Sequence, residues 1–152
     1  MKKTKLQKIM ISCFIFLMVL VGNTETQAVE KYVIGAMMAL SGPAHGKTID
    51  DGVNLSRLAV KEINQRGGVD GVKMELIWED HKARGPEAVA GFKKLVDINH
   101  AQAIAMGYTT PIMACAPIAD QKKILFMNVG AYGPKVAGAG KYLFHLPANE
   151  LI

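Results

Sequence analysis

The strongest constraint on this fold is the alternation of short apolar runs with longer stretches whose apolar residues recur at helical spacing. Apolar runs of strand length occupy residues 32–38, 72–78, 103–106, 124–129 and 142–145. Helical spacing occupies residues 50–66, 86–96 and 110–121. Strands that alternate with helices form parallel sheets through right-handed crossovers. The sequence therefore predicts an α/β fold, an open parallel sheet with helices on both faces.

The residue pattern within each run indicates its place in the sheet. Residues 32–38 are almost wholly apolar, which is typical of a strand covered on both faces. Residues 72–78 alternate polar and apolar side chains, so this strand is expected nearer the sheet edge. Residues 133–140 are expected to form a flexible loop, and 148–152 the start of another helix.

Glycine, proline and threonine mark the ends of the expected helices. Gly67 and Gly68 follow the first helix and stop it, and Pro86 begins the second. Thr110 is expected to be the N-cap of the third helix because proline follows it and suits the first helical position. Pro117 is expected to bend or shorten that helix, since proline removes a backbone donor.

Residues 1–28 have the layout of a cleavable secretory signal. Four lysines precede an apolar run at 9–21, and a polar stretch ends at Thr26-Gln27-Ala28, where cleavage is expected. The apolar run is 13 residues long, whereas a membrane-spanning helix needs about 20. An uncleaved anchor is therefore the weaker interpretation, and a periplasmic or otherwise extracytoplasmic location is expected.

Removal of the signal also removes most of the positive charge. The chain has 18 Lys and Arg and 13 Asp and Glu, of which residues 1–28 hold four lysines and Glu25. The remaining 14 basic and 12 acidic side chains leave a net charge of +2. No nucleic-acid partner is indicated by so small an excess.

Cleavage also leaves Cys115 as the only cysteine, so an internal disulfide is excluded from residues 29–152. Between two alanines Cys115 is interpreted as a buried packing residue, and a reactive nucleophile is the alternative. Residues 29–152 are long enough for one core of ordinary domain size, hence one domain.

A ligand site is expected at the carboxyl ends of the strands, where ligands bind in open parallel sheets. The loops there are residues 39–49, 79–85, 107–111 and 130–134. Thr109 and Thr110 offer hydroxyls at a helix N-terminus, whose free amides favour a carboxylate. The alternative is that Thr110 only caps its own helix.

The loop after the first strand nearly matches the phosphate-binding pattern G-x-x-x-x-G-K-[ST], with Ser41 in place of the first glycine and Gly46-Lys47-Thr48 at its end. Two acids, Asp50 and Asp51, follow where phosphates would bind, and an exported protein meets little ATP. A nucleotide site is therefore the minor alternative. His45 in the same loop is a candidate ligand contact.

The sequence has neither a metal-ligand spacing such as H-E-x-x-H or C-x-x-C nor a G-x-S-x-G elbow. No cofactor, metal site or enzymatic activity is expected. Aromatic residues lie near the same edge: Tyr108 and Tyr132 each follow a strand and are candidates to stack on a ligand, whereas Trp78, inside a strand, is interpreted as packing.

At these residues the sequence resembles the periplasmic leucine/isoleucine/valine-binding protein family, the type I solute-binding components of ABC importers. The resemblance covers residues 31–149. Its most specific part is the Asn-x-x-Gly-Gly-x-x-Gly stretch at 64–71. The other marks are 34–36 running into Ser41-Gly42-Pro43, the pair Glu79-Asp80, and 142–145 after 124–127.

The resemblance implies a two-lobed protein that closes on an amino acid or a similar small solute and delivers it to a membrane permease. Residues 29–152 would be most of the N-terminal lobe, truncated, with the C-terminal lobe missing. In that family the ligand carboxylate meets a hydroxyl residue that maps onto Thr109 or Thr110. Backbone and hydroxyl groups after the fourth strand hold the rest of the ligand in that family, and these positions map onto Gly130 and Tyr132.

Two departures from the family pattern bear on specificity. A small hydroxyl residue is common in the family where Tyr132 stands. The first loop is shorter than usual, with Lys47 near a place where an acid is frequent. A different carboxylate, an amide or an aromatic acid therefore fits as well as a branched-chain amino acid. The ligand-binding ectodomain of a sensor is an alternative to transport.

Overall fold

The structure of the chain is a computed structural model that describes residues 30–146. Its five strands all pair in parallel, in the order β2-β1-β3-β4-β5. The strands are β1 (Lys31–Met38), β2 (Lys73–Asp80), β3 (Ala103–Met106), β4 (Leu125–Asn128) and β5 (Leu143–His145). The helices are α2 (Lys47–Gln65), α3 (Gly85–Lys93) with the π-helical turn η1 (Lys94–Ile98), α4 (Thr109–Lys122) and α5 (Pro134–Ala137).

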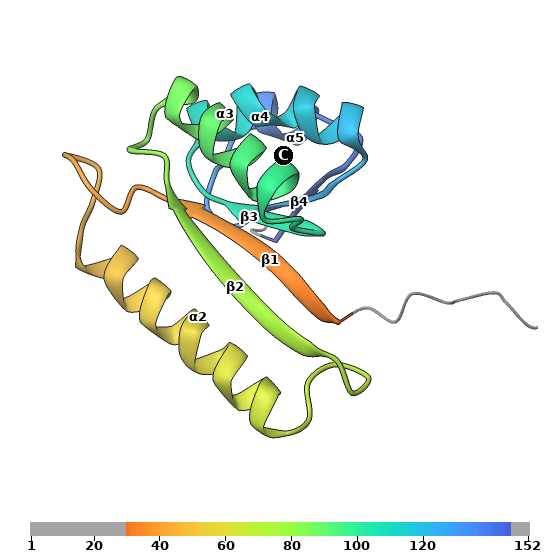
Figure 1. Cartoon of the computed structure of the whole chain (residues 1–152). Helices are drawn as coiled ribbons and strands as arrows, with labels where there is room; N and C mark the ends of the chain where they lie inside the picture. The colour runs from red at the N-terminus through yellow and green to blue at the C-terminus, as the bar shows by residue number, and fades with distance from the viewer. Residues whose placement is uncertain (1–29, 147–152) are drawn as a thin grey trace, which may run out of the picture.

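The helices lie on both faces of the sheet, as predicted. Figure 1 shows α2 along one face beside β1 and β2, and α3, α4 and α5 on the opposite face. The predicted edge position of the second strand is also confirmed, because β2 pairs with β1 alone. The expected signal peptide and the expected helix start at 148–152 lie outside the described residues.

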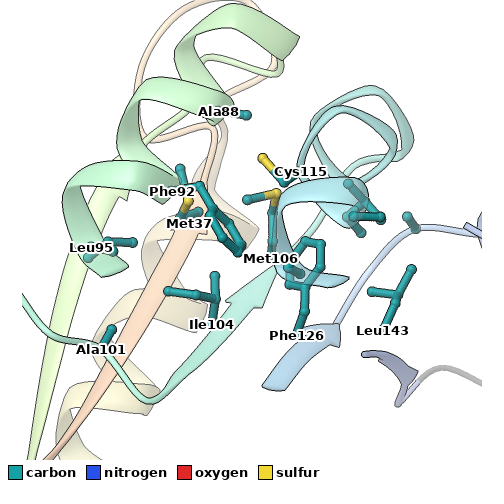
Figure 2. Packing of buried hydrophobic residues seen from close by; sticks show 14 of the residues in the cluster. Met37, Ala88, Phe92, Leu95, Ala101, Ile104, Met106, Cys115, Phe126 and Leu143 are labelled. Carbon is teal, nitrogen blue, oxygen red and sulfur yellow. The ribbon is translucent and has the colours of Figure 1, made fainter. Parts of the chain in front are cut away.

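The core lies between the sheet and the layer formed by α3 and α4 (Figure 2). Phe92 of α3 and Phe126 of β4 pack edge to face, with ring centroids 5.3 Å apart. Gly35 lets η1 approach β1 closely, since a Cβ there would lie 2.8 Å from Leu95 Cδ1. Close packing of this kind leaves no room for even one added methyl group.

Cys115 is completely buried in this core. Burial raises the pKa of its thiol to about 12, so the thiolate that a nucleophile needs is absent at neutral pH. The structure therefore supports packing over reactivity for this residue.

The glycine-rich stretch after α2 forms a Schellman motif. The Gly68 amide donates to the Ile63 carbonyl at 2.9 Å and the Gly67 amide to the Asn64 carbonyl at 3.2 Å. The Asn64 side chain donates to the Met74 carbonyl and accepts from its amide, both at 2.8 Å. One asparagine thus joins the end of α2 to the start of β2.

Several expected helix boundaries are wrong. Helix α2 begins at Lys47, three residues earlier than the pattern indicated, and α4 begins at Thr109 after Tyr108, so Thr110 is not its N-cap. Pro111 is then the third helical residue, where its missing donor costs nothing because that amide has no helical partner. Helix α4 continues past Pro117 to Lys122.

The loop expected at 133–140 contains α5, which begins at Pro134, a residue whose fixed φ suits a first helical position. The expected loop therefore contains one short helix. None of the helices within residues 30–146 is long and apolar enough to cross a membrane.

Candidate ligand-binding site

The carboxyl ends of β1 and β3 form the topological switch point of the sheet. The chain leaves β1 through α2 on one face, and it reaches β3 through α3 on the other. The loops after these strands diverge there, which is where ligands bind in open α/β sheets. In the structure these loops are residues 39–46 and 107–108, flanked by 81–84 and 129–133.

Thr109 and Thr110, the predicted carboxylate contacts, are the first two residues of α4, and both are exposed. No side chain within the described residues caps this helix. The alternative that Thr110 only caps its own helix is therefore wrong. The amides of a first helical turn have no intrahelical partners and present partial positive charge. Two amides and two hydroxyls are therefore available together at this edge.

Tyr108, the residue before α4, has φ +66°, which is unusual for a side chain of this size. Its hydroxyl donates to the Ala44 carbonyl at 2.6 Å and so joins the loop after β3 to the loop after β1. Its ring packs edge to face on His81, with centroids 5.5 Å apart. The hydroxyl is thus already used within the protein, which leaves the ring surface for a ligand.

The loop after β1 is held by Asp80, the last residue of β2. The Ser41 hydroxyl donates to Asp80 Oδ2 at 2.5 Å and the Leu40 amide to Asp80 Oδ1 at 2.9 Å. Ser41, a predicted ligand contact, is exposed but is bound to this carboxylate. Any ligand would meet Ser41 in the orientation that Asp80 imposes.

The candidate His45 is hydrogen-bonded to Asp50 rather than standing free. Its Nε2 lies 2.8 Å from Asp50 Oδ1, and Lys47 Nζ lies 3.1 Å from Asp51 Oδ1 one turn further along α2. Two carboxylates therefore occupy the start of α2. A phosphate-binding loop needs that position electropositive, so the geometry opposes the nucleotide alternative.

The loop after β4 is organised by Asn128, which is completely buried. Its Oδ1 accepts from the Gly130 and Ala131 amides at 3.1 and 2.7 Å, and its Nδ2 donates to the Ala131 carbonyl at 2.7 Å. The predicted contact Gly130 thus has its amide turned toward Asn128. A Cβ at Gly130 would lie 4.0 Å from Gly107 Cα, so this loop lies beside the one that leads into α4. Tyr132, in the same loop, is exposed.

Sequence inspection missed Asp80, His81 and Asn128 as residues that shape the site. Their signal was positional, because each is a polar residue at the end of a strand or directly after it. Trp78, interpreted as packing, is half-buried in β2 and lines a cavity of about 320 Å³ between the sheet and α2.

A family comparison matches this architecture to known proteins. The sequence profile described as periplasmic binding protein matches residues 31–150. The chain belongs to the periplasmic binding protein family. The family assignment covers all five strands and the edge at which the candidate residues lie. A search of curated protein sequences found no match.

Solved structures of transporter solute-binding proteins have the same fold. A branched-chain amino acid transporter substrate-binding protein from Streptococcus pneumoniae, in complex with isoleucine, is 26% identical with a TM-score of 0.66. An ABC transporter substrate-binding protein from Sphaerobacter thermophilus is 26% identical with a TM-score of 0.61. A solute-binding protein from Rhodopseudomonas palustris, in complex with 3,4-dihydroxybenzoic acid, is 24% identical with a TM-score of 0.63.

These similarities cover 76% of this chain but only 33%, 32% and 31% of the three solved chains, in the same order. The chain therefore spans about a third of the length of the solute-binding proteins that it matches.

Proposed function

We propose that residues 29–152 are the N-terminal lobe of an extracytoplasmic solute-binding protein, with residues 1–28 as its export signal. It captures an amino acid or a similar small carboxylate or amide and delivers it to the permease of an ABC importer, without catalysis. The observation that carries the proposal is the family match over residues 31–150, which spans the loops of the switch point.

The geometry suits a carboxylate ligand. The start of α4 presents unpaired amides beside the Thr109 and Thr110 hydroxyls. Isoleucine, bound by the Streptococcus pneumoniae relative, carries such a carboxylate. Gly130 and Tyr132 lie in the adjacent loop after β4. A second lobe would close over the ligand by hinge motion.

Thermal melting of the purified full-length protein, with both lobes, against a panel of amino acids and organic acids tests this function. A solute at 100 times its Kd stabilises the folded state by about 2.7 kcal/mol, so its melting temperature rises. In Thr110→Ala we expect the affinity for that solute to fall roughly tenfold, the worth of one hydrogen bond.

The control is Asn54→Ala, because Asn54 is exposed within α2 and lies outside the loops at the carboxyl edge. This variant should keep the wild-type affinity. If no solute in a broad panel shifts the melting temperature, solute capture is refuted. If Asn54→Ala weakens binding as much as Thr110→Ala, the start of α4 is not the carboxylate site.

A further inference from the structure

His81 is a buried titratable residue at the carboxyl edge that the proposed ligand contacts leave unused. It directly follows β2, its side chain is completely buried, and its amide donates to the Met38 carbonyl at 3.1 Å. Nδ1 accepts from the Ala83 amide at 3.0 Å, so the proton of the neutral ring lies on Nε2. Nε2 has no hydrogen-bond partner within residues 30–146. A buried unpaired donor lowers stability, which points to a role beyond packing.

The turn that follows His81 is strained. Lys82 has φ +50° and Ala83 has φ +57°, a left-handed backbone that residues other than glycine avoid. Two side chains at the end of β2 hold this turn. Asp80 Oδ1 accepts from the Lys82 amide at 2.8 Å, and His81 Nδ1 accepts from the Ala83 amide. Strain that the surroundings hold in place is typical of functional sites.

The same imidazole ring supports Tyr108, the residue before α4. Tyr108 has φ +66°, and its ring packs on His81 at an interplanar angle of 81°. The Tyr108 carbonyl accepts from the Ile112 amide at 3.2 Å, which makes it part of the first turn of α4. His81 thus lies between two strained segments and contacts both.

We propose that His81 is a positioning residue of the ligand site. Its Nδ1 holds the turn at 81–84, and its ring holds Tyr108, so that the Thr109 and Thr110 amides are in place before a carboxylate binds. The proposal rests on the proposed function, because it assigns the carboxylate to the start of α4. A site that is ordered in advance loses less conformational entropy on binding.

The protonation state of His81 agrees with this role. Burial lowers the pKa of the imidazole, and the opposing effect of the Asp80 carboxylate does not outweigh it. At neutral pH the ring is therefore uncharged and Nδ1 remains an acceptor for Ala83.

Two substitutions separate the two contacts of His81. His81→Asn keeps an acceptor near the position of Nδ1 but removes the ring, whereas His81→Phe keeps a ring but removes the acceptor. In the full chain, amide hydrogen exchange measured by NMR should be faster at Ile112 in H81N and faster at Ala83 in H81F, each by roughly three- to tenfold. The other amide should keep its wild-type rate in each variant.

The control is His100→Asn, which makes the same substitution at an exposed position before β3, at the opposite end of the sheet. It should change neither amide. Unchanged exchange at Ile112 in H81N overturns the proposal, since the ring then does not hold the start of α4. In case the variants do not fold, the tautomer of wild-type His81 is read from ¹⁵N chemical shifts. A proton on Nδ1 also overturns the proposal, and a proton on Nε2 supports it.

Solute affinity separates this proposal from the proposed function. If the wild-type protein binds a solute from the panel, we expect roughly three- to tenfold weaker binding in H81N and no change in H100N. Faster exchange at Ile112 with unchanged affinity overturns the link between His81 and the ligand. If the wild-type protein binds nothing, the proposed function fails, whereas the exchange rates still decide whether His81 positions α4.

Discussion

At the scale of single residues, the carboxyl edge depends on polar side chains at strand ends that bind backbone groups of other loops. Asp80 shows this most clearly, since it accepts hydrogen bonds from Leu40, Ser41 and Lys82. Partial burial raises the pKa of this carboxyl, but the three hydrogen bonds outweigh burial, so the pKa lies below its ordinary value of 3.8. The ionised form is therefore the one that holds the first loop.

Asp80→Asn should lower the free energy of unfolding at neutral pH by about 1–3 kcal/mol, because a charged acceptor is replaced by a neutral one. The lowered pKa makes this stabilisation present above pH 3.8 and lost as pH falls through the folded-state pKa. Urea unfolding should therefore show a smaller difference between variant and wild type at about pH 3 than at pH 7.

The control for Asp80 is Asp70→Asn, an exposed residue with φ +49°, a conformation that asparagine tolerates. It should leave stability unchanged at both pH values. A difference between Asp80→Asn and wild type that does not shrink in acid would show that the carboxylate charge is not what holds the loop.

At the scale of elements, the junction between α2 and β2 is set by local backbone geometry. Gly68 has φ +86°, and a Cβ there would lie 2.0 Å from the Val72 carbonyl oxygen. Only glycine fits, because both the left-handed backbone and the missing side chain are required. The stretch at 64–71 that carried the family resemblance is thus a structural junction, at the opposite end of the strands from the carboxyl edge.

Gly68→Ala should lower the free energy of unfolding by more than about 2 kcal/mol, since the left-handed cost of roughly 1–2 kcal/mol is joined by a steric clash. The matched control is Gly52→Ala inside α2, where a Cβ would meet nothing within 4 Å. That substitution should raise stability by about 0.5–1 kcal/mol. Chemical denaturation measures both, and equal effects would contradict the assigned junction.

At the scale of the whole molecule, the two faces of the sheet are covered unequally. Helices α3, α4 and α5 cover one face, whereas the other carries α2 beside β1 and β2 (Figure 1). The apolar side chains Leu125, Val129 and Phe144 are 43%, 40% and 53% exposed. Within residues 30–146 this part of the sheet has no covering helix. Parallel sheets are ordinarily buried on both faces.

Replacement of Leu125 and Phe144 by threonine should reduce binding of a hydrophobic dye and concentration-dependent association, with a change in stability of no more than about 0.5 kcal/mol. Threonine suits an exposed strand position. The contrasting variant is Phe126→Thr, whose neighbouring position on β4 points into the core. It should cost about 3–5 kcal/mol. Dye fluorescence and light scattering measure the reduced dye binding and association. If the Leu125 and Phe144 variant lost as much stability as Phe126→Thr, these two side chains would not lie on an uncovered part of the sheet.

Sequence inspection predicted the elements well and the site contacts less well. Strand and helix periodicity is a local property, so the five strands and three longer helices follow from residues near in the chain. Thr110 was expected to cap α4, but Tyr108 occupies the N-cap position, and its side chain contacts His81 and Ala44. Nothing local to Thr110 indicates those contacts.

The sequence by itself determined the α/β class, the parallel sheet and the family, because these follow from apolar periodicity and from glycines that local backbone geometry requires. Only the tertiary structure decided how the carboxyl edge is built. The Tyr108 hydroxyl meets a carbonyl 64 residues away, and Ser41 meets Asp80 across 39 residues. Such pairs form only because the strand order places β1 between β2 and β3.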